Sequence, residues 1–194
     1  MNILKLNIAV ALIICLFTVK ASSEELPDGI YTSATDFINR KMNYQLNADH
    51  RKDKLYINEF LNGAYIKIIA EGKERKLLKK DAFGYRYAQQ DYRFYKNNEY
   101  KIVDTAGFYL YTHRELVQSV KGYELHNIYY FSKTASAPIL PLTLKNMEAV
   151  YPQNTKLRYL IEGQFSTDTA LSQFDTVLNT YKIKYIYLQG LKDN

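Results

Sequence analysis

Between residues 29 and 133 the chain alternates short apolar segments with polar breaks. The segments are rich in Tyr, Ile, Val and Phe, which favour strands, and breaks such as Asn62-Gly63 contain turn-forming residues. Connections of mostly two to five residues are too short for parallel crossovers, so consecutive strands are expected to pair antiparallel. The expected strands span residues 54–60, 64–70, 75–79, 84–87, 93–95, 100–104, 108–113 and 124–132.

The hydrophobic period changes after Pro138, where apolar residues recur every three or four positions. The spacing predicts one helix that ends near residue 151, a second over 157–165, and a third that begins after Asp168 and continues to Tyr181. Residues 182–188 fit either a continuation of this helix or a last strand. A short capped helix over 33–39 is expected before the sheet.

Because the strands come first and the helices last, we expect an α+β fold. An antiparallel sheet of about eight short strands, which could close into a barrel-like form, should precede about three helices. The chain shows no break in composition that would divide it. We therefore expect a single domain over residues 22–194.

Residues 1–21 have the pattern of a secretory signal peptide. Lys5 precedes the apolar run 8–17, and a small-residue motif predicts cleavage between Ala21 and Ser22. A run of ten residues spans only about 15 Å as a helix, which is too short for a membrane anchor. Cys15 follows Ile14 inside this run, so lipid attachment is not expected. The protein is therefore predicted to be periplasmic or secreted, with no transmembrane segment after cleavage.

The composition excludes several classes of function. Cleavage would remove the single cysteine and two lysines, which leaves no thiol and takes the net charge from +6 to +4. The sequence contains no Gly-rich phosphate loop, nucleophile elbow, paired-histidine zinc helix or acidic calcium loop. No catalytic residue, metal site or cofactor is predicted. The basic clusters 51–54 and 73–80 fit solvated strand faces, and no nucleic-acid partner is expected for an exported protein of modest charge.

One aromatic and histidine-bearing face is the candidate ligand site. Tyr109, Tyr111 and His113 alternate along one expected strand, and Glu124 and His126 alternate along the next. If the intervening ten residues fold back symmetrically, His113 lies opposite Glu124 and His126 lies diagonally on the same face. Such a face could bind a ligand or a metal, although solvated strand residues give the same pattern.

Several short motifs resemble those of a group of secreted proteins of Bacteroidota that have no assigned activity. They are the opening Leu26-Pro27-Asp28-Gly29-Ile30-Tyr31 with Asp36-Phe37, then Lys79-Lys80-Asp81-Ala82-Phe83-Gly84-Tyr85, Gly107-Phe108-Tyr109, and the stretch from Pro141 to Asn146. The resemblance implies export and a setting in the cell envelope. It transfers no catalytic residue.

The leading hypothesis is an exported, non-enzymatic binding or accessory protein of the bacterial cell envelope, whose partner is unknown and could be an envelope protein or a glycan. One alternative is a periplasmic hydrolase or metal-dependent enzyme that uses the His/Glu/Tyr face. Another is a carbohydrate- or polymer-binding protein, since 19 tyrosines offer flat rings with polar tips. The abundance of tyrosine is equally explained by its preference for half-buried strands.

Overall fold

The computed structural model describes residues 26–47, 52–57 and 63–191. The expected signal peptide 1–21, its cleavage site at Ala21 and Ser22, and Asn62 of the expected turn lie outside these residues. Among the described residues, no helix is long and apolar enough to cross a membrane.

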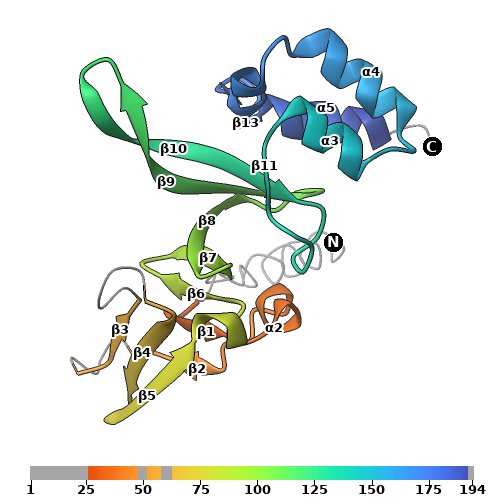
Figure 1. Cartoon of the computed structure of the whole chain (residues 1–194). Helices are drawn as coiled ribbons and strands as arrows, with labels where there is room; N and C mark the ends of the chain where they lie inside the picture. Colours follow the sequence, from red (N-terminus) through yellow and green to blue (C-terminus); the bar gives the residue numbers. More distant parts are fainter. Residues whose placement is uncertain (1–25, 48–51, 58–62, 192–194) are drawn as a thin grey trace, which may run out of the picture.

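The fold is α+β, and its largest element is one eight-stranded antiparallel sheet (Figure 1). The strand order is β11-β10-β9-β8-β7-β6-β1-β2, so strands from β6 to β10 follow one another as a meander. The strands are β1 (Gly29–Tyr31), β2 (Tyr44–Gln45), β6 (Gly84–Tyr87), β7 (Gln90–Tyr95), β8 (Asn98–Asp104), β9 (Tyr109–Ser119), β10 (Gly122–Ser132) and β11 (Leu140–Pro141). The expected antiparallel meander is confirmed, but the sheet stays open and does not close into a barrel.

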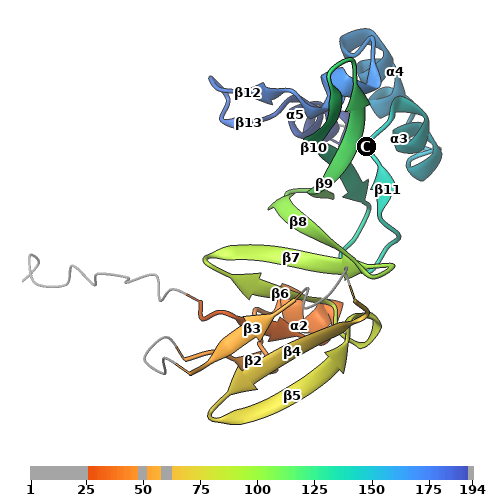
Figure 2. The same cartoon turned by 60° about the vertical axis from the view of Figure 1, so that its left-hand side comes forward.

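A second, three-stranded sheet covers one end of the large sheet (Figure 2). It consists of β3 (Lys54–Tyr56), β4 (Tyr65–Ala70) and β5 (Lys73–Leu78), followed by the 3-10 helix η2 (Lys79–Asp81). Ile66 and Ile68 of β4 are fully buried and pack with Ile30, Tyr85 and Phe94 of the large sheet. The face that carries these three side chains is called the first face below.

A helical group covers the other end of the first face (Figure 1). It comprises α3 (Leu144–Val150), α4 (Thr155–Gln164), the 3-10 helix η3 (Asp168–Ser172) and α5 (Lys182–Leu191). Its apolar side chains form one core with the fully buried Phe108, Leu110 and Phe131 of the sheet. The first two expected helices are therefore confirmed.

The opposite, second face packs against α2 (Ala34–Ile38) and the loop that follows β10. Phe37 of α2 contacts Phe83 and Tyr109, and Ile139 packs beside the buried Tyr111. Ser33 caps α2 as expected, because its hydroxyl accepts a hydrogen bond from the Asp36 amide at 3.0 Å. Both faces of the central strands are thus partly covered.

The expected third helix is wrong. After η3 the chain forms a small hairpin of β12 (Phe174–Asp175) and β13 (Thr180–Tyr181), and the next helix is α5. The Asp175 carboxylate accepts hydrogen bonds from the amides of Val177 and Leu178, both at 2.9 Å. Asp at such a position competes with helical hydrogen bonds, and here the turn prevails over the apolar spacing. Residues 182–188 are helical, but as part of the separate helix α5 and not as a continuation of the expected third helix.

Candidate functional site

A groove of about 630 Å³ crosses the middle of the first face, between the three-stranded sheet and the helical group. The three-stranded sheet and the helical group each bury the part of the large sheet on which they pack. Between these two parts, the side chains of the first face stay accessible. Strands β7, β8, β9 and β10 supply the floor, and Tyr181 of β13 supplies one wall.

The floor contains one continuous cross-strand row. Tyr92 pairs with Lys101, Lys101 pairs with Thr112, and Thr112 pairs with Tyr129. Directly paired residues of neighbouring strands share a face, so the four side chains lie side by side. The row therefore places an ammonium group and a hydroxyl between two aromatic rings.

A second cation and an amide lie next to this row. Arg114 pairs with Asn127, two residues further along β9 and β10, and both side chains are exposed. Lys101 is also exposed. Within the described part of the chain, neither Lys101 nor Arg114 has a hydrogen-bond or ion-pair partner. Their charges are available to a ligand.

The tyrosines of the groove are held in fixed orientations by their neighbours. Tyr92 stacks on Tyr85 with ring centroids 4.6 Å apart and planes 5° apart. Tyr129 meets the edge of Tyr181 at 5.8 Å. Burial, with contributions from the neighbouring Tyr129, raises the pKa of Tyr181 to about 12. Its hydroxyl therefore remains protonated and able to donate at neutral pH.

Glu99 supplies a carboxylate near one end of the groove. The Tyr85 hydroxyl donates a hydrogen bond of 2.6 Å to it. Burial first, and the charge of Glu99 second, raise the pKa of Tyr92 above its ordinary value. The carboxylate is held against the tyrosine pair, and the cations stand further along the floor.

This arrangement suits recognition of an anionic ligand that carries flat or ring-shaped apolar surfaces. Aromatic rings stack on such surfaces, and the cations pair with carboxylate or phosphate groups. A concave site with aromatic walls and a few polar groups is the usual form of a ligand pocket.

The residues predicted from the sequence lie on the second face and do not all meet in one cavity, although His113 is also among the residues that line the groove. Tyr111 is fully buried, and its hydroxyl lies 3.1 Å from the Arg93 guanidinium. His113 is half-buried, and its Nδ1 lies 2.8 Å from the Glu99 carbonyl oxygen. Glu124 and His126 are exposed, and a Glu124 carboxylate oxygen lies 3.4 Å from His126 Nε2. Tyr109 lines a different cavity.

The expected register is also wrong, although the shared face is confirmed. His113 lies opposite Ile128, and Glu124 lies opposite Val117. The chain reverses tightly after Ser119, where Gly122 has a φ of 121°, and not through a long symmetric loop. The residue opposite His113 is Ile128 instead of Glu124, a shift of four positions. Because side chains alternate between the two faces, an even shift keeps these side chains on the same face.

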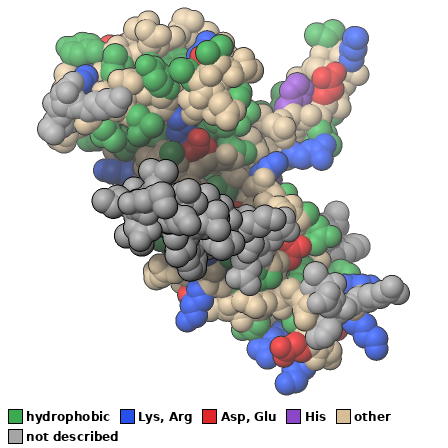
Figure 3. Space-filling view, turned by 180° about the vertical axis from the view of Figure 1, so that it is seen from behind, with side chains coloured by type: hydrophobic (Ala, Val, Ile, Leu, Met, Phe, Trp, Pro, Cys, Tyr) green, Lys and Arg blue, Asp and Glu red, His purple; other side chains and the backbone are tan. Residues whose placement is uncertain are grey.

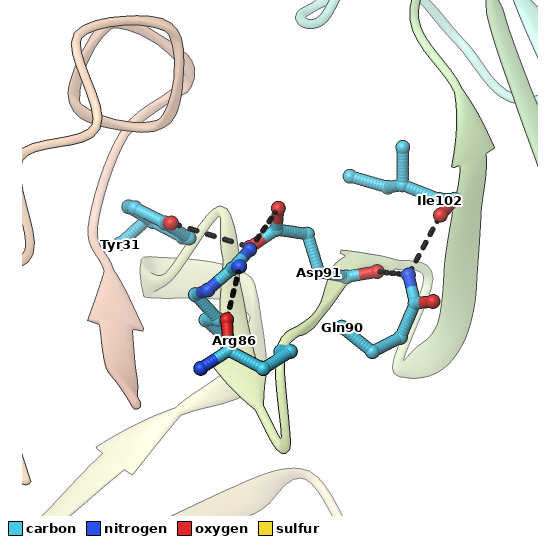
Figure 4. Close-up of polar contacts among 6 residues, drawn as sticks. Tyr31, Arg86, Gln90, Asp91 and Ile102 are labelled. Atoms are coloured by element: carbon cyan, nitrogen blue, oxygen red, sulfur yellow. Dashed lines mark hydrogen bonds and ion pairs between the residues drawn. The ribbon is translucent and has the colours of Figure 1, made fainter. Parts of the chain in front are cut away.

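The other cavity, of about 300 Å³, lies on the second face beside a polar cluster (Figure 4). Asp91 accepts hydrogen bonds from the Tyr31 hydroxyl at 3.2 Å and from Arg86 at 2.7 Å. Burial first, and Asp91 second, raise the pKa of Tyr31 to about 12. Gln90 donates to the Ile102 carbonyl at 2.7 Å. These groups bind one another and so join β1, β6, β7 and β8.

Side chains able to bind a metal do not cluster in the described residues. Among residues 26–47, 52–57 and 63–191, no three His, Cys, Asp or Glu side chains lie close enough to hold an ion. Of the residues predicted from the sequence, Glu124 and His126 lie close together, and they are two residues.

Sequence reasoning missed the groove because its residues come from five strands. A usable signal was present in part: Lys101 interrupts an apolar strand, and Thr112 and Arg114 alternate with His113. Alternation places them on the face opposite to the predicted site. That this part of the first face is accessible follows only from where the three-stranded sheet and the helical group pack on it.

Comparisons with known proteins give no match: no family model, no curated protein and no solved structure resembles the chain. The functional argument therefore rests on geometry and charge.

Proposed function

We propose that this protein is an exported, non-enzymatic binding protein of the bacterial cell envelope that holds an anionic carbohydrate in the groove of the first face. The observation that carries the proposal is the floor row in which Lys101 stands between Tyr92 and Tyr129. Export rests on the sequence pattern of residues 1–21.

The chemistry of the groove favours a sugar over a wholly apolar ligand. Tyrosine rings stack on the apolar faces of sugar rings, while their hydroxyls and the Asn127 amide exchange hydrogen bonds with sugar hydroxyls. Lys101 and Arg114 then select for carboxylate or phosphate substituents. Their position on neighbouring strands and in neighbouring rows suits charges that repeat along a polymer.

Binding of polygalacturonate, with neutral dextran as the comparison, tests the proposal by isothermal titration calorimetry. We expect the protein to bind the anionic polymer in preference to dextran, with an affinity that falls as salt is added. Lys101→Glu should weaken binding by about tenfold or more, since it replaces attraction by repulsion. Tyr129→Ala should weaken it by removing a stacking surface.

Matched controls lie on the helical group, away from the groove. Lys145→Glu makes the same change of charge on exposed α3, and Tyr159→Ala removes an exposed ring from α4. Both should bind as the unsubstituted protein does. Equal loss in Lys101→Glu and Lys145→Glu would show that net charge alone drives binding and would overturn the groove as the site.

A further inference from the structure

The distal half of the β9–β10 hairpin, residues 114–127, projects from the body as an arm (Figures 1 and 3). On its outer edge, β10 pairs with β11 only at Tyr130 and Phe131. Residues 122–127 are exposed, and in the described part of the chain β9 is the one strand that pairs with this stretch, so its outer edge is open. The arm thus presents an open strand edge of about six residues.

The direction of the backbone groups on this edge follows from one hydrogen bond. The Leu142 amide donates to the Tyr129 carbonyl at 3.0 Å, so the polar groups of Tyr129 point away from β9. In antiparallel pairing this direction alternates along a strand. The N–H and C=O groups of Tyr123, Leu125 and Asn127 therefore also point outward.

The arm also exposes large apolar side chains. Exposed fractions are 67% for Leu116, 57% for Leu125 and 71% for Tyr123, and Val120 at the tip is completely exposed. Leu116 and Leu125 form a cross-strand pair on the first face. An isolated two-stranded ribbon is marginally stable, and an open apolar edge is a template for another strand.

We propose that this edge pairs with the same edge of a second copy, so that two arms form a four-stranded antiparallel sheet across a twofold axis at Leu125. In this register Leu125 faces Leu125 of the partner subunit, and Tyr123 faces Asn127 of the partner subunit. All these residues direct their backbone groups outward, so the pairing satisfies both edges.

Charge selects this register among those that the backbone allows. Pairing at Leu125 places Glu124 opposite His126 of the partner subunit, and His126 opposite Glu124 of the partner subunit. A shift of one residue toward the tip places Glu124 against its own copy, and a shift toward the base moves Glu124 away from His126 of the partner subunit and opposite Ile128 of the partner subunit. Like charges directly opposite each other destabilise a sheet.

The tip of each arm has a matching recess in the other subunit. In the proposed register the turn at Val120 and Lys121 reaches the end of the open edge, next to Leu142, which already bonds to Tyr129. There a cavity of about 270 Å³ opens between β10, β11 and η3, lined in part by Leu142 and Asp168. The Asp168 carboxylate, which accepts a hydrogen bond from the Leu144 amide at 2.8 Å, lies in the lining of this cavity.

Disulfide trapping tests the twofold axis directly. In a protein with Cys15→Ser, Leu125→Cys introduces the sole thiol at a position where facing Cα atoms would be about 5.5 Å apart, within the range of a disulfide. We expect covalent dimers on mild oxidation. The matched control Leu116→Cys lies on the same face, but its two copies would be separated by three strand spacings, about 14 Å, and should stay uncrosslinked. Equal crosslinking of both, or of neither, would overturn the proposal.

Sedimentation velocity tests the dimer independently, because it measures association without an engineered disulfide. Leu125→Pro removes an outward N–H and should abolish the dimer, while Leu116→Pro removes an N–H from the other edge of the arm and should retain it. Glu124→Arg should weaken the dimer, and addition of His126→Glu should restore it. A native protein that stays monomeric up to about 100 μM would refute the pairing.

Discussion

The buried Lys184 predicts an unusual pH dependence of stability. Its ammonium group is 1% exposed and lies 3.2 Å from the Asp104 carboxylate, 3.0 Å from the Ala106 carbonyl oxygen and against the Phe108 carbonyl. Burial lowers the pKa of Lys184 to about 8, although Asp104 acts in the opposite direction. The ordinary value of 10.5 applies to the unfolded chain.

The lowered pKa fixes the sign of the effect. Between about pH 8 and pH 10.5 the unfolded chain binds more protons at this lysine than the folded protein, so stability rises with pH. Below about pH 8 the full penalty of burying the charge applies, at most about 3 kcal/mol. From about pH 7.5 to about pH 9.5 the recovered part is about 2 kcal/mol.

Tyrosines oppose this rise and make a comparison between variants necessary. Burial raises the pKa of several of them, including Tyr31 and Tyr181, each to about 12. Their ionisation in the unfolded chain near pH 10 therefore destabilises the fold. Lys184→Met leaves the tyrosines in place, so subtracting its pH dependence from that of the native protein isolates Lys184.

Urea unfolding at about pH 7.5 and about pH 9.5, followed by far-ultraviolet circular dichroism, measures the difference. We expect the native protein to gain about 2 kcal/mol relative to Lys184→Met between the two conditions. The exposed Lys182→Met is the control and should follow the native protein. Parallel pH dependence in native protein and Lys184→Met, within about 0.5 kcal/mol, would refute the reasoning.

Three further predictions concern the architecture. A Cβ at Gly84 would lie 2.0 Å from the Tyr92 carbonyl oxygen, so Gly84→Ala should cost about 3 kcal/mol in urea unfolding; a loss under about 1 kcal/mol would mean that the strands separate easily. Thr143→Ala removes the cap that accepts from the Asn146 amide at 3.1 Å and should cost about 1 kcal/mol, while Thr143→Ser should restore most of it. Asp175→Ala should accelerate amide exchange within the β12–β13 hairpin without changing global stability by more than about 1 kcal/mol; unchanged exchange would show that the turn does not depend on this carboxylate.

The strands that pack on a core could be predicted from the sequence. For the strand segments that contact no core, the length and register were missed. Apolar alternation in β4 and β8 reports burial on one face, which is a local property of the sequence. The distal part of the β9–β10 hairpin contacts no core, so its apolar alternation, as in Tyr123-Glu124-Leu125-His126, does not correspond to burial on one face. Its length is set by cross-strand pairing alone, which the sequence pattern does not report.

The helical region shows a different limit. The spacing of Leu171, Phe174, Val177 and Leu178 fits a helix, yet only Leu171 is buried and the other three are exposed. Apolar spacing predicts a helix when its stripe has a surface to cover. Here no such surface lies beneath these residues, and the hydrogen bonds of Asp175 decide the local structure.

The groove and the open edge of the arm both arise because β9 and β10 extend beyond the elements that pack on them. Strands β9 and β10 have 11 residues each, which corresponds to about 36 Å, and the helical group packs on residues near their base such as Leu110 and Phe131. The covers at the two ends leave the groove between them, and the uncovered excess of β9 and β10 forms the arm. A sheet built only for stability would gain nothing from exposing Leu116, Tyr123 and Leu125 on this excess. Their presence is explained if the arm is buried in an assembly, and because Leu125 and Asn127 also line the groove, the dimer edge and the ligand groove would adjoin each other.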